Sequence, residues 1–311
     1  MSTTPGVTDC TGGLAVVGAV CIGALLLTLL CWCWRAFKTF ILSEVWRVDL
    51  KKYGGWAVVT GATSGIGKAY AKELAKRGLD IVLISRSNEK LKAVAEEIEA
   101  QYGRRTMTIQ ADFTGGGSIY PAIKEALSGM DLGILVNNVG MTYNVKLQRF
   151  HEVQNSEQIV NCNMLSVTQM TRIVLPDMVK RGSGLIINIG SATAAKPCSL
   201  ISLYCSTKAF VKYFSQCLET EYKSQGITVQ CVAPMVVSTN MTWNCPVNCL
   251  VKSTSDFARQ ALNTVGYSSY TNGCISHGLQ SVVFGLAPGW IKSLAYLIKR
   301  RRQVKEDLHE E

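Results

Sequence analysis

The chain has 311 residues and a formal net charge of +10, with 32 lysines and arginines against 22 aspartates and glutamates. Hydrophobic residues make up 48% of it and charged residues only 17%, which is apolar for a water-soluble enzyme and points to a membrane. The positive charges are dispersed, with no basic helix interleaved with aromatics, which argues against nucleic acid as a partner, and no His, Asp and Glu cluster indicates a metal.

The N-terminal part of the chain predicts a membrane anchor. Residues 12–34 are almost wholly apolar and carry no charge, and about 20 such residues span a bilayer. A cleaved signal peptide would need a positive start, whereas only Asp9 is charged before this run. We therefore expect a lumenal segment 1–11, a transmembrane anchor 12–34 and a basic linker 35–53. The basic residues follow the anchor, which predicts that the rest of the chain faces the cytosol.

From residue 54 onward, strand-like runs alternate with helical segments. The runs begin near Ala57, Asp80, Thr106, Gly133, Gly184 and Thr228. This alternation predicts a Rossmann-like, doubly wound parallel sheet with helices on both faces, in a single α/β domain over residues 54–275. Ligands of such folds bind at the carboxyl ends of the strands.

The first of these runs leads into a glycine-rich loop. Trp-Ala-Val-Val is followed by Thr-Gly-Ala-Thr-Ser-Gly-Ile-Gly, residues 60–67, and then by a helical segment that ends at Gly78. Glycines allow a tight turn and close approach of a pyrophosphate, whose charge meets the helix N-terminus. The strand, loop and helix together predict a dinucleotide site, and its expected contacts are Gly61, Ser64, Gly65, Ile66 and Gly67.

The next two strands indicate which dinucleotide binds. The second ends in Ser85-Arg86, where enzymes that use NAD usually place a carboxylate for the ribose hydroxyl. A guanidinium at this place suits a 2′-phosphate, which predicts NADPH/NADP as the cofactor. Asp112, at the end of the third strand, is the expected partner of the adenine edge.

Later in the chain, four residues carry a pattern suited to ketone reduction. Tyr204 and Lys208 have the spacing i, i+4, which puts both on one helix face. A neighbouring ammonium favours the phenolate, so we expect Lys208 to lower the pKa of Tyr204 toward the working range. Ser191 ends an apolar strand and can hold the same carbonyl oxygen, and Asn163 lies in the helix before that strand.

The order of these motifs resembles the short-chain dehydrogenase/reductase family. The match rests on Thr-Gly-x-x-x-Gly-x-Gly, on Asn-Asn-x-Gly at residues 137–140, and on a serine followed by Tyr-x-x-x-Lys, over roughly residues 54 to 240. The resemblance implies that Tyr204 is the general acid, Lys208 binds the nicotinamide ribose, Ser191 orients the carbonyl and Asn163 positions a relay water. It also implies cofactor contacts from Asn138, Gly140, Pro234, Tyr204 and Lys208, and transfer of the 4-pro-S hydride.

Within that family the chain resembles the membrane-bound 17β-hydroxysteroid dehydrogenases of types 3 and 12 and a fish 20β-hydroxysteroid dehydrogenase of type 2. The resemblance implies a reductase of the endoplasmic reticulum membrane and allows a homodimer. The substrate we favour at this stage is a ketosteroid, reduced at carbon 17 or 20. A very-long-chain 3-oxoacyl-CoA is the alternative substrate. A third possibility is a catalytically inactive protein that keeps the fold for partner binding. The intact tetrad of Asn163, Ser191, Tyr204 and Lys208 argues against it.

The C-terminal part predicts a substrate lid and a second contact with lipid. We expect a lid over residues 235–274, whose apolar Met235, Val236, Val237 and Met241 either line a substrate or form the core of the lid. Residues 276–311 are expected to hold a membrane-associated apolar segment and a charged tail. The apolar run 278–298 is interrupted by Pro288-Gly289, which favours a helix pair at the membrane interface over a full span.

Overall fold

The structure, a computed structural model of the chain, describes residues 6–143 and 147–286. It divides into two compact units, Met1–Trp46 and Arg47–Glu311. The first unit contains α1 (Gly6–Phe37), a π-helical turn η1 (Lys38–Leu42) and α2 (Ser43–Val45). Residues Gly12–Val45 are long and apolar enough to cross a membrane. The helical segment thus continues to Val45, through the first half of the predicted basic linker 35–53.

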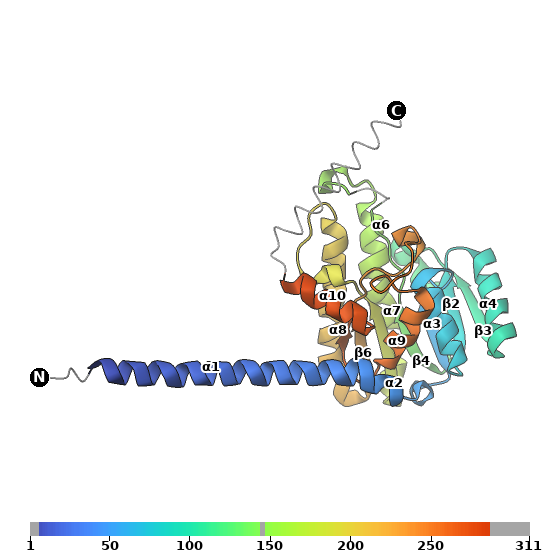
Figure 1. Cartoon of the computed structure of the whole chain (residues 1–311). Helices are drawn as coiled ribbons and strands as arrows, with labels where there is room; N and C mark the ends of the chain where they lie inside the picture. The colour runs from blue at the N-terminus through green and yellow to red at the C-terminus, as the bar shows by residue number, and fades with distance from the viewer. Residues whose placement is uncertain (1–5, 144–146, 287–311) are drawn as a thin grey trace, which may run out of the picture. The chain divides into compact units, whose positions relative to one another are not determined.

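The second unit is built on one parallel sheet with the strand order β3-β2-β1-β4-β5-β6-β7 (Figure 1). The prediction of a doubly wound α/β fold is confirmed, and all six expected strands are present. The seventh, of two residues, was not expected and pairs with β6. The strands are β1 (Trp56–Thr60), β2 (Asp80–Ser85), β3 (Thr106–Gln110), β4 (Leu132–Asn137), β5 (Gly184–Ile189), β6 (Ile227–Val232) and β7 (Tyr270–Thr271).

Helices cover both faces of this sheet. On one face lie α3 (Gly65–Lys76), α4 (Asn88–Tyr102) and α9 (Thr254–Asn263), and on the other lie α5 (Tyr120–Ala126), α7 (Ser166–Arg181) and α8 (Ser202–Tyr222). The remaining helical segments are η2 (Leu50–Tyr53), η3 (Phe113–Ile119), η4 (Phe150–Glu152), α6 (Ser156–Val160), η5 (Asn161–Leu165), η6 (Ala192–Ala195), η7 (Lys223–Gln225), η8 (Asn240–Thr242) and α10 (Ile275–Leu286).

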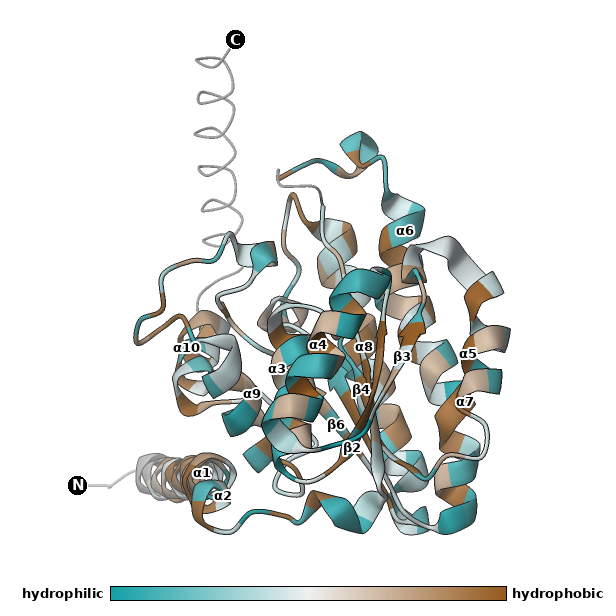
Figure 2. Cartoon of the chain, turned by 90° about the vertical axis from the view of Figure 1, so that its right-hand side faces the viewer, coloured by the Kyte–Doolittle hydropathy of each residue, from teal (hydrophilic) through white to brown (hydrophobic). Residues whose placement is uncertain are grey.

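Alternation along the strands divides the core into two layers. In β1, Ala57 and Val59 pack with α3 and α9, whereas Val58 packs on the opposite face, with α7. This is the period of two expected for a strand. Because both faces are covered, the strands read as continuous apolar runs, and Figure 2 shows brown strands between helices that carry teal on their outer surfaces.

The predicted lid is only partly an exposed segment. In α9 the side chains of Phe257, Ala258 and Ala261 are fully buried in the core, against α3. Residues 254–263 therefore belong to the packed core of the domain. The candidate lid shrinks to residues 235–253, in which Val236 and Met241 are exposed and Val237 belongs to the core.

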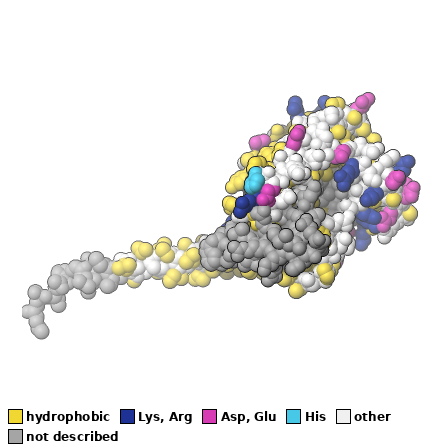
Figure 3. Space-filling view, turned by 90° about the horizontal axis from the view of Figure 1, so that it is seen from above, with side chains coloured by type: hydrophobic (Ala, Val, Ile, Leu, Met, Phe, Trp, Pro, Cys, Tyr) yellow, Lys and Arg dark blue, Asp and Glu magenta, His cyan; other side chains and the backbone are white. Residues whose placement is uncertain are grey.

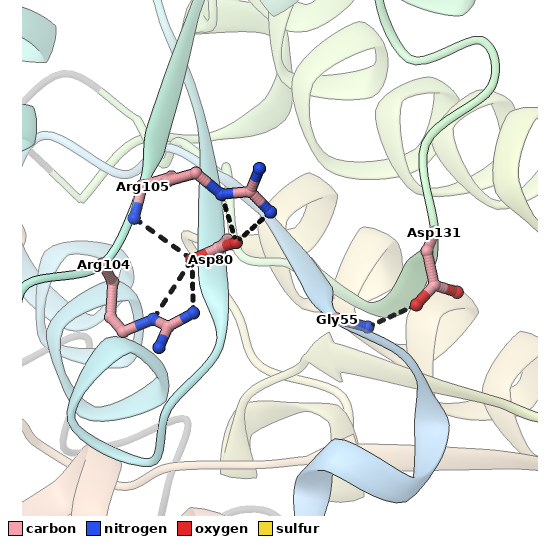
Figure 4. A network of polar contacts seen from close by, with 5 residues as sticks. All are labelled: Gly55, Asp80, Arg104, Arg105 and Asp131. Atoms are coloured by element: carbon pink, nitrogen blue, oxygen red, sulfur yellow. Dashed lines mark hydrogen bonds and ion pairs between the residues drawn. The ribbon is translucent and has the colours of Figure 1, made fainter.

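The amino ends of the strands are held by charged groups that are paired with one another (Figure 4). Asp80, buried at the start of β2, accepts hydrogen bonds from the Nη2 of Arg104 at 2.8 Å and from the Nε of Arg105 at 2.8 Å. Burial opposes ionisation of Asp80, but these bonds outweigh it and keep its pKa below the usual value. Asp131 accepts from the Gly55 amide at 2.7 Å.

The last described helix, α10, is apolar on its outer side. Leu279 and Val283 are 60% and 68% exposed, and Leu286 is 80% exposed. The predicted interfacial segment 278–298 therefore begins inside α10, and its part beyond Leu286 lies outside the described residues.

Candidate active site

The glycine-rich loop connects β1 to α3 in a shape that side chains would prevent. Gly61 and Gly65 have φ values of +65° and +56°, a region that favours glycine. A Cβ at Gly67 would collide with the Asn138 amide and the Gly61 carbonyl. Ser64 precedes α3 but its side chain caps no backbone amide, so the N–H groups of the first turn have no side-chain cap and form a favourable site for an anion.

Asn138 fixes this loop to the next strand. Its Nδ2 donates to the carbonyls of Thr60 and Gly61 at 2.9 and 3.3 Å. The hydroxyl of Thr60 in turn accepts from the amides of Asn138 and Val139, both at 3.0 Å. Asn138 therefore shapes the loop by holding its backbone, which is an indirect contribution to a dinucleotide site.

Arg86 is exposed at the carboxyl end of β2, where the sequence places a phosphate contact. Asp112 lies close enough for the Arg86 charge to help lower its pKa, although the main cause is a hydrogen bond from the Thr114 amide. The other candidates for this role have structural partners, because Lys68 pairs with Glu97 at 2.8 Å and Ser87 caps α4.

Asn163 lies in the π-helical turn η5, and its side chain is held at both ends. Its Oδ1 accepts from the Met141 amide at 2.8 Å, and its Nδ2 donates to the Met141 carbonyl at 2.9 Å and to Thr207 Oγ1 at 3.0 Å. These bonds join the segment after β4 to α8. π-Helical turns inserted in helices are frequent at functional sites.

Ser191 and Tyr204 meet at the carboxyl end of β5. The Ser191 hydroxyl lies near enough to the Tyr204 phenol to help lower its pKa, and it accepts a hydrogen bond from Thr193 Oγ1 at 2.9 Å. Ser191 also caps η6, accepting from the Thr193 amide at 3.2 Å. The serine is thus fixed by its own turn with its hydroxyl against the tyrosine.

Lys208 lies one turn after Tyr204 in α8, as the spacing predicts. Its Nζ donates to the Ile189 carbonyl at 2.9 Å and lies 5.9 Å from the centre of the Tyr204 ring. A Cβ at Gly140 would be 3.3 Å from this Nζ and 3.4 Å from Asn163 Oδ1. The structure therefore brings Gly140, Asn163, Tyr204 and Lys208 together with Ser191 in one cluster.

The expected pKa of Tyr204 is wrong in direction. Burial raises the pKa of Tyr204 to about 12, and the hydrogen bond with Ser191 offsets only part of this. Burial also lowers the pKa of Lys208 to about 8. The i, i+4 spacing was read correctly, but burial is the largest cause of the shift in both groups. In this structure Tyr204 is a protonated phenol at neutral pH, which suits a proton donor.

Sequence reasoning missed residues that hold the cluster in place. Thr193 and Thr207 bind Ser191 and Asn163, and the buried Tyr143 accepts from the Leu203 amide at the start of α8 at 2.8 Å. Asn272 donates to the Ala233 carbonyl at 2.8 Å, beside Pro234. Thr207 occupies a variable position of the Tyr-x-x-x-Lys motif and the others belong to no motif used above, so only the fold shows their roles.

Comparison with known proteins identifies the family. The family model described as short chain dehydrogenase matches residues 55–248. The chain belongs to the short-chain dehydrogenase family. It is therefore an oxidoreductase acting on a CH–OH group or ketone, and its fold binds a nicotinamide dinucleotide.

Among its relatives, the chain is 44% identical over 290 residues to a very-long-chain 3-oxoacyl-CoA reductase of Bos taurus, covering 90% of each chain. It is 44% identical over 259 residues to the 17-beta-hydroxysteroid dehydrogenase type 3 of Homo sapiens, covering 82% of this chain and 83% of that one. A solved short-chain dehydrogenase from Sphingobium yanoikuyae in complex with NADPH has 32% identity and a TM-score of 0.61, over 67% of this chain and 82% of that one.

The residues present fit a nicotinamide dinucleotide. The uncapped first turn of α3 and the glycines before it suit a pyrophosphate, while Arg86 supplies a positive charge one strand away. The polar cluster at the ends of β4 and β5 lies beyond this loop, on the same edge of the sheet. A dinucleotide can thus extend along the carboxyl edge of the strands.

Proposed function

We propose that this protein reduces the 3-oxo group of very-long-chain acyl-CoA with NADPH. The observation that carries the proposal is the 44% identity to a very-long-chain 3-oxoacyl-CoA reductase over 90% of both chains. This relative supports the acyl-CoA substrate better than the ketosteroid that we favoured from the family resemblance, because the 17-beta-hydroxysteroid dehydrogenase type 3 match covers less of the chain. The intact cluster of Asn163, Ser191, Tyr204 and Lys208 supports an active enzyme.

The chain's own groups would act on the ketone oxygen. The Ser191 hydroxyl lies near enough to the Tyr204 phenol to influence its pKa, so one oxygen placed between the two hydroxyls can accept from both. Tyr204, held protonated by burial, would donate its proton to this oxygen while Ser191 orients it. Bound NADPH would supply the hydride to the carbonyl carbon.

Lys208 and Asn163 would sustain the proton donor. The Lys208 Nζ uses one of its donors on the Ile189 carbonyl, which leaves others for the nicotinamide ribose. Its positive charge would stabilise the phenolate left on Tyr204 after proton transfer. Asn163 would hold a relay water through which that phenolate is reprotonated.

The cofactor would bind along the glycine loop and the strand ends. The proposed contacts are Gly61, Ser64, Gly65, Ile66, Gly67, Arg86, Asp112, Asn138, Gly140, Tyr204, Lys208 and Pro234. Of these, Arg86 would choose NADPH over NADH, because a guanidinium binds a 2′-phosphate through charge-assisted hydrogen bonds.

The enzyme would work at the endoplasmic reticulum membrane, with the unit that starts at Arg47 in the cytosol. Support comes from the apolar helix Gly12–Val45 and from the basic residues that follow its apolar run. Exposed apolar side chains of the second unit, among them Trp243 at 68% and Val247 at 58%, suit contact with lipid. In Figure 3 hydrophobic side chains gather at the upper left of the globular unit, while many of the charged side chains lie along its top and right.

The topology is tested by adding protease to sealed microsomes that carry the full chain. We expect degradation of the catalytic unit and survival of a small N-terminal fragment. Protection of the whole chain, or glycosylation of Asn240 in its Asn-Met-Thr sequon, would place the catalytic unit in the lumen instead.

The substrate is tested by offering the same microsomes NADPH with a very-long-chain 3-oxoacyl-CoA, a 17-ketosteroid and a 20-ketosteroid. Microsomes carrying the Tyr204→Phe variant are the background. We expect the highest kcat/KM with the acyl-CoA. A ketosteroid turned over faster than the acyl-CoA would establish the second candidate, which the similarity to 17-beta-hydroxysteroid dehydrogenase type 3 favours.

A further inference from the structure

A histidine with no part in the tetrad lies behind the segment that follows β6. His277 is in the first turn of α10 and is 0% exposed. Its Nδ1 accepts a hydrogen bond from the Met235 amide at 3.3 Å. The other side of the site is apolar, since the ring lies 5.4 Å from that of the buried Phe257 in α9, centre to centre.

The surroundings keep this imidazole neutral. Burial lowers the pKa of His277 to about 4, and the charge of Lys252 acts in the same direction. The carbonyls of Val236, Leu250 and Asn272 surround the ring and favour the charged form, but they do not outweigh burial. A neutral ring that accepts through Nδ1 carries its proton on Nε2, a buried atom for which the described residues offer no hydrogen-bond partner.

The segment that His277 holds leads directly to the catalytic serine. Met235 follows Pro234, whose carbonyl accepts from the amide of Ala192 at 3.0 Å, next to Ser191. The same segment is held at its start by Asn272, which donates to the Ala233 carbonyl at 2.8 Å. His277 therefore connects α10 to the Ser191 turn through the backbone of Pro234 and Met235.

The other end of the candidate lid, near residues 250–252, is also held by α10. Gln280, three residues after His277 in α10, donates to the Leu250 carbonyl at 3.0 Å. The backbone of Val236 accepts from the Lys252 amide at 3.3 Å. Both sides of the candidate lid 235–253 are thus tied to the first turns of α10, and His277 is the buried one of the two ties.

We propose that His277 is a positioning residue for hydride transfer. Its neutral imidazole holds the Met235 amide, and through Pro234 it sets where the backbone over the nicotinamide lies relative to Ser191. The proposal rests on the proposed function in that Pro234 is taken as part of the cofactor site. Its role does not depend on which ketone is the substrate.

The test compares two substitutions of His277 in the full chain, in lipid nanodiscs. His277→Leu keeps bulk but removes the acceptor, while the Oδ1 of His277→Asn can take the place of Nδ1. We expect the leucine variant to raise the NADPH Kd about five- to tenfold and to lower kcat, because a buried amide loses its partner. The asparagine variant should restore both to within about twofold of wild type.

Asn263→Ala is the matched control. Asn263 is also buried and accepts from the Arg77 Nη2 at 2.7 Å, on the last turn of α9. Its loss should lower Tm without changing the NADPH Kd. His277→Leu behaving like this control would overturn the proposal, and so would an asparagine variant as impaired as the leucine variant.

Two further arms keep the test decisive. If His277→Leu does not fold, His277→Gln replaces it, because its longer side chain displaces the acceptor; wild-type NADPH affinity in that variant would refute the proposal. NADPH binding is measured without any ketone. Failure of wild type to reduce 3-oxoacyl-CoA would therefore count against the proposed function and leave the test of His277 intact.

Discussion

The two edges of the one sheet use polar side chains in different ways. At the amino ends of the strands, the charge of Asp80 is matched by Arg104 and Arg105, so that its hydrogen-bonding capacity is taken up (Figure 4). At the carboxyl ends, Lys208 is held by a backbone carbonyl, while the hydroxyls of Ser191 and Tyr204 face each other. The ion pairs at the amino edge use up their charges and stabilise the fold, whereas the hydroxyls and the ammonium at the carboxyl edge keep donors that can act on a substrate.

The largest loss of activity should follow from removing the proton donor at the carboxyl edge. Tyr204→Phe should lower kcat by about a hundredfold or more, because general acid catalysis typically contributes 10²–10⁴-fold. Tm should hardly change, since only the hydrogen bond to Ser191 is lost. The measurement is NADPH oxidation with saturating ketone, beside a thermal melt. A variant that keeps more than about a few percent of the wild-type rate would refute the assigned acid.

Lys208→Met is the informative companion. It should lose turnover and also weaken NADPH, because the same ammonium is expected to serve the phenol and the ribose. If Tyr204→Phe weakened NADPH binding as much as Lys208→Met does, the separate roles given to the two residues would be wrong.

The next largest effect should follow from reversing the charge at the end of β2. Arg86→Asp should lower kcat/KM for NADPH about ten- to a hundredfold, because charge-assisted hydrogen bonds contribute about 1.5–3 kcal/mol. NADH should be tolerated better, since a carboxylate accepts from the free 2′-hydroxyl. Lys68→Ala is the control, because Lys68 is already paired with Glu97. An unchanged NADPH/NADH ratio in Arg86→Asp would mean that another residue selects the cofactor.

At the amino edge the expected change is in stability alone. Asp80→Ala leaves Arg104 and Arg105 without their carboxylate and should cost about 1–3 kcal/mol of unfolding free energy. The Arg105 side chain is 75% exposed and that of Arg104 is 34% exposed, so both guanidinium groups can reach water, which keeps the cost from being larger. Denaturant unfolding measures the loss. The kcat/KM should stay within about twofold of wild type, and a large drop would show that this edge reaches the active site.

The last prediction concerns the loss of thermal stability as the pH falls. Because the pKa of His277 is lowered to about 4 in the fold, its contribution to stability is present above the unfolded pKa of about 6.5 and is lost as the pH falls through 4. Between pH 6.5 and 4, wild type should lose about 5–10 °C of Tm more than His277→Asn does. Parallel Tm profiles for the two proteins would show that His277 is not buried as a neutral ring.

Much of this architecture could be predicted from the sequence, because the strands are buried on both faces and therefore read as uninterrupted apolar runs. The cluster of Ser191, Tyr204 and Lys208 could be predicted because helical spacing and motif order are local properties. The direction of the Tyr204 pKa shift could not, since burial of the phenol depends on segments far away in the chain. His277 had no motif around it, and its importance arises only where α10 meets the segment after β6.

We propose above that this chain transfers a hydride from NADPH to a 3-oxoacyl carbon with Tyr204 as the acid. It is tested most directly by incubating the full chain in nanodiscs with (4S)-deuterated NADPH and a very-long-chain 3-oxoacyl-CoA, then analysing the product by mass spectrometry. We expect wild type to form a product with one deuterium on the carbon that carries the new hydroxyl, and Tyr204→Phe to form essentially none. Product without deuterium, or equal labelled product from both proteins, would contradict it.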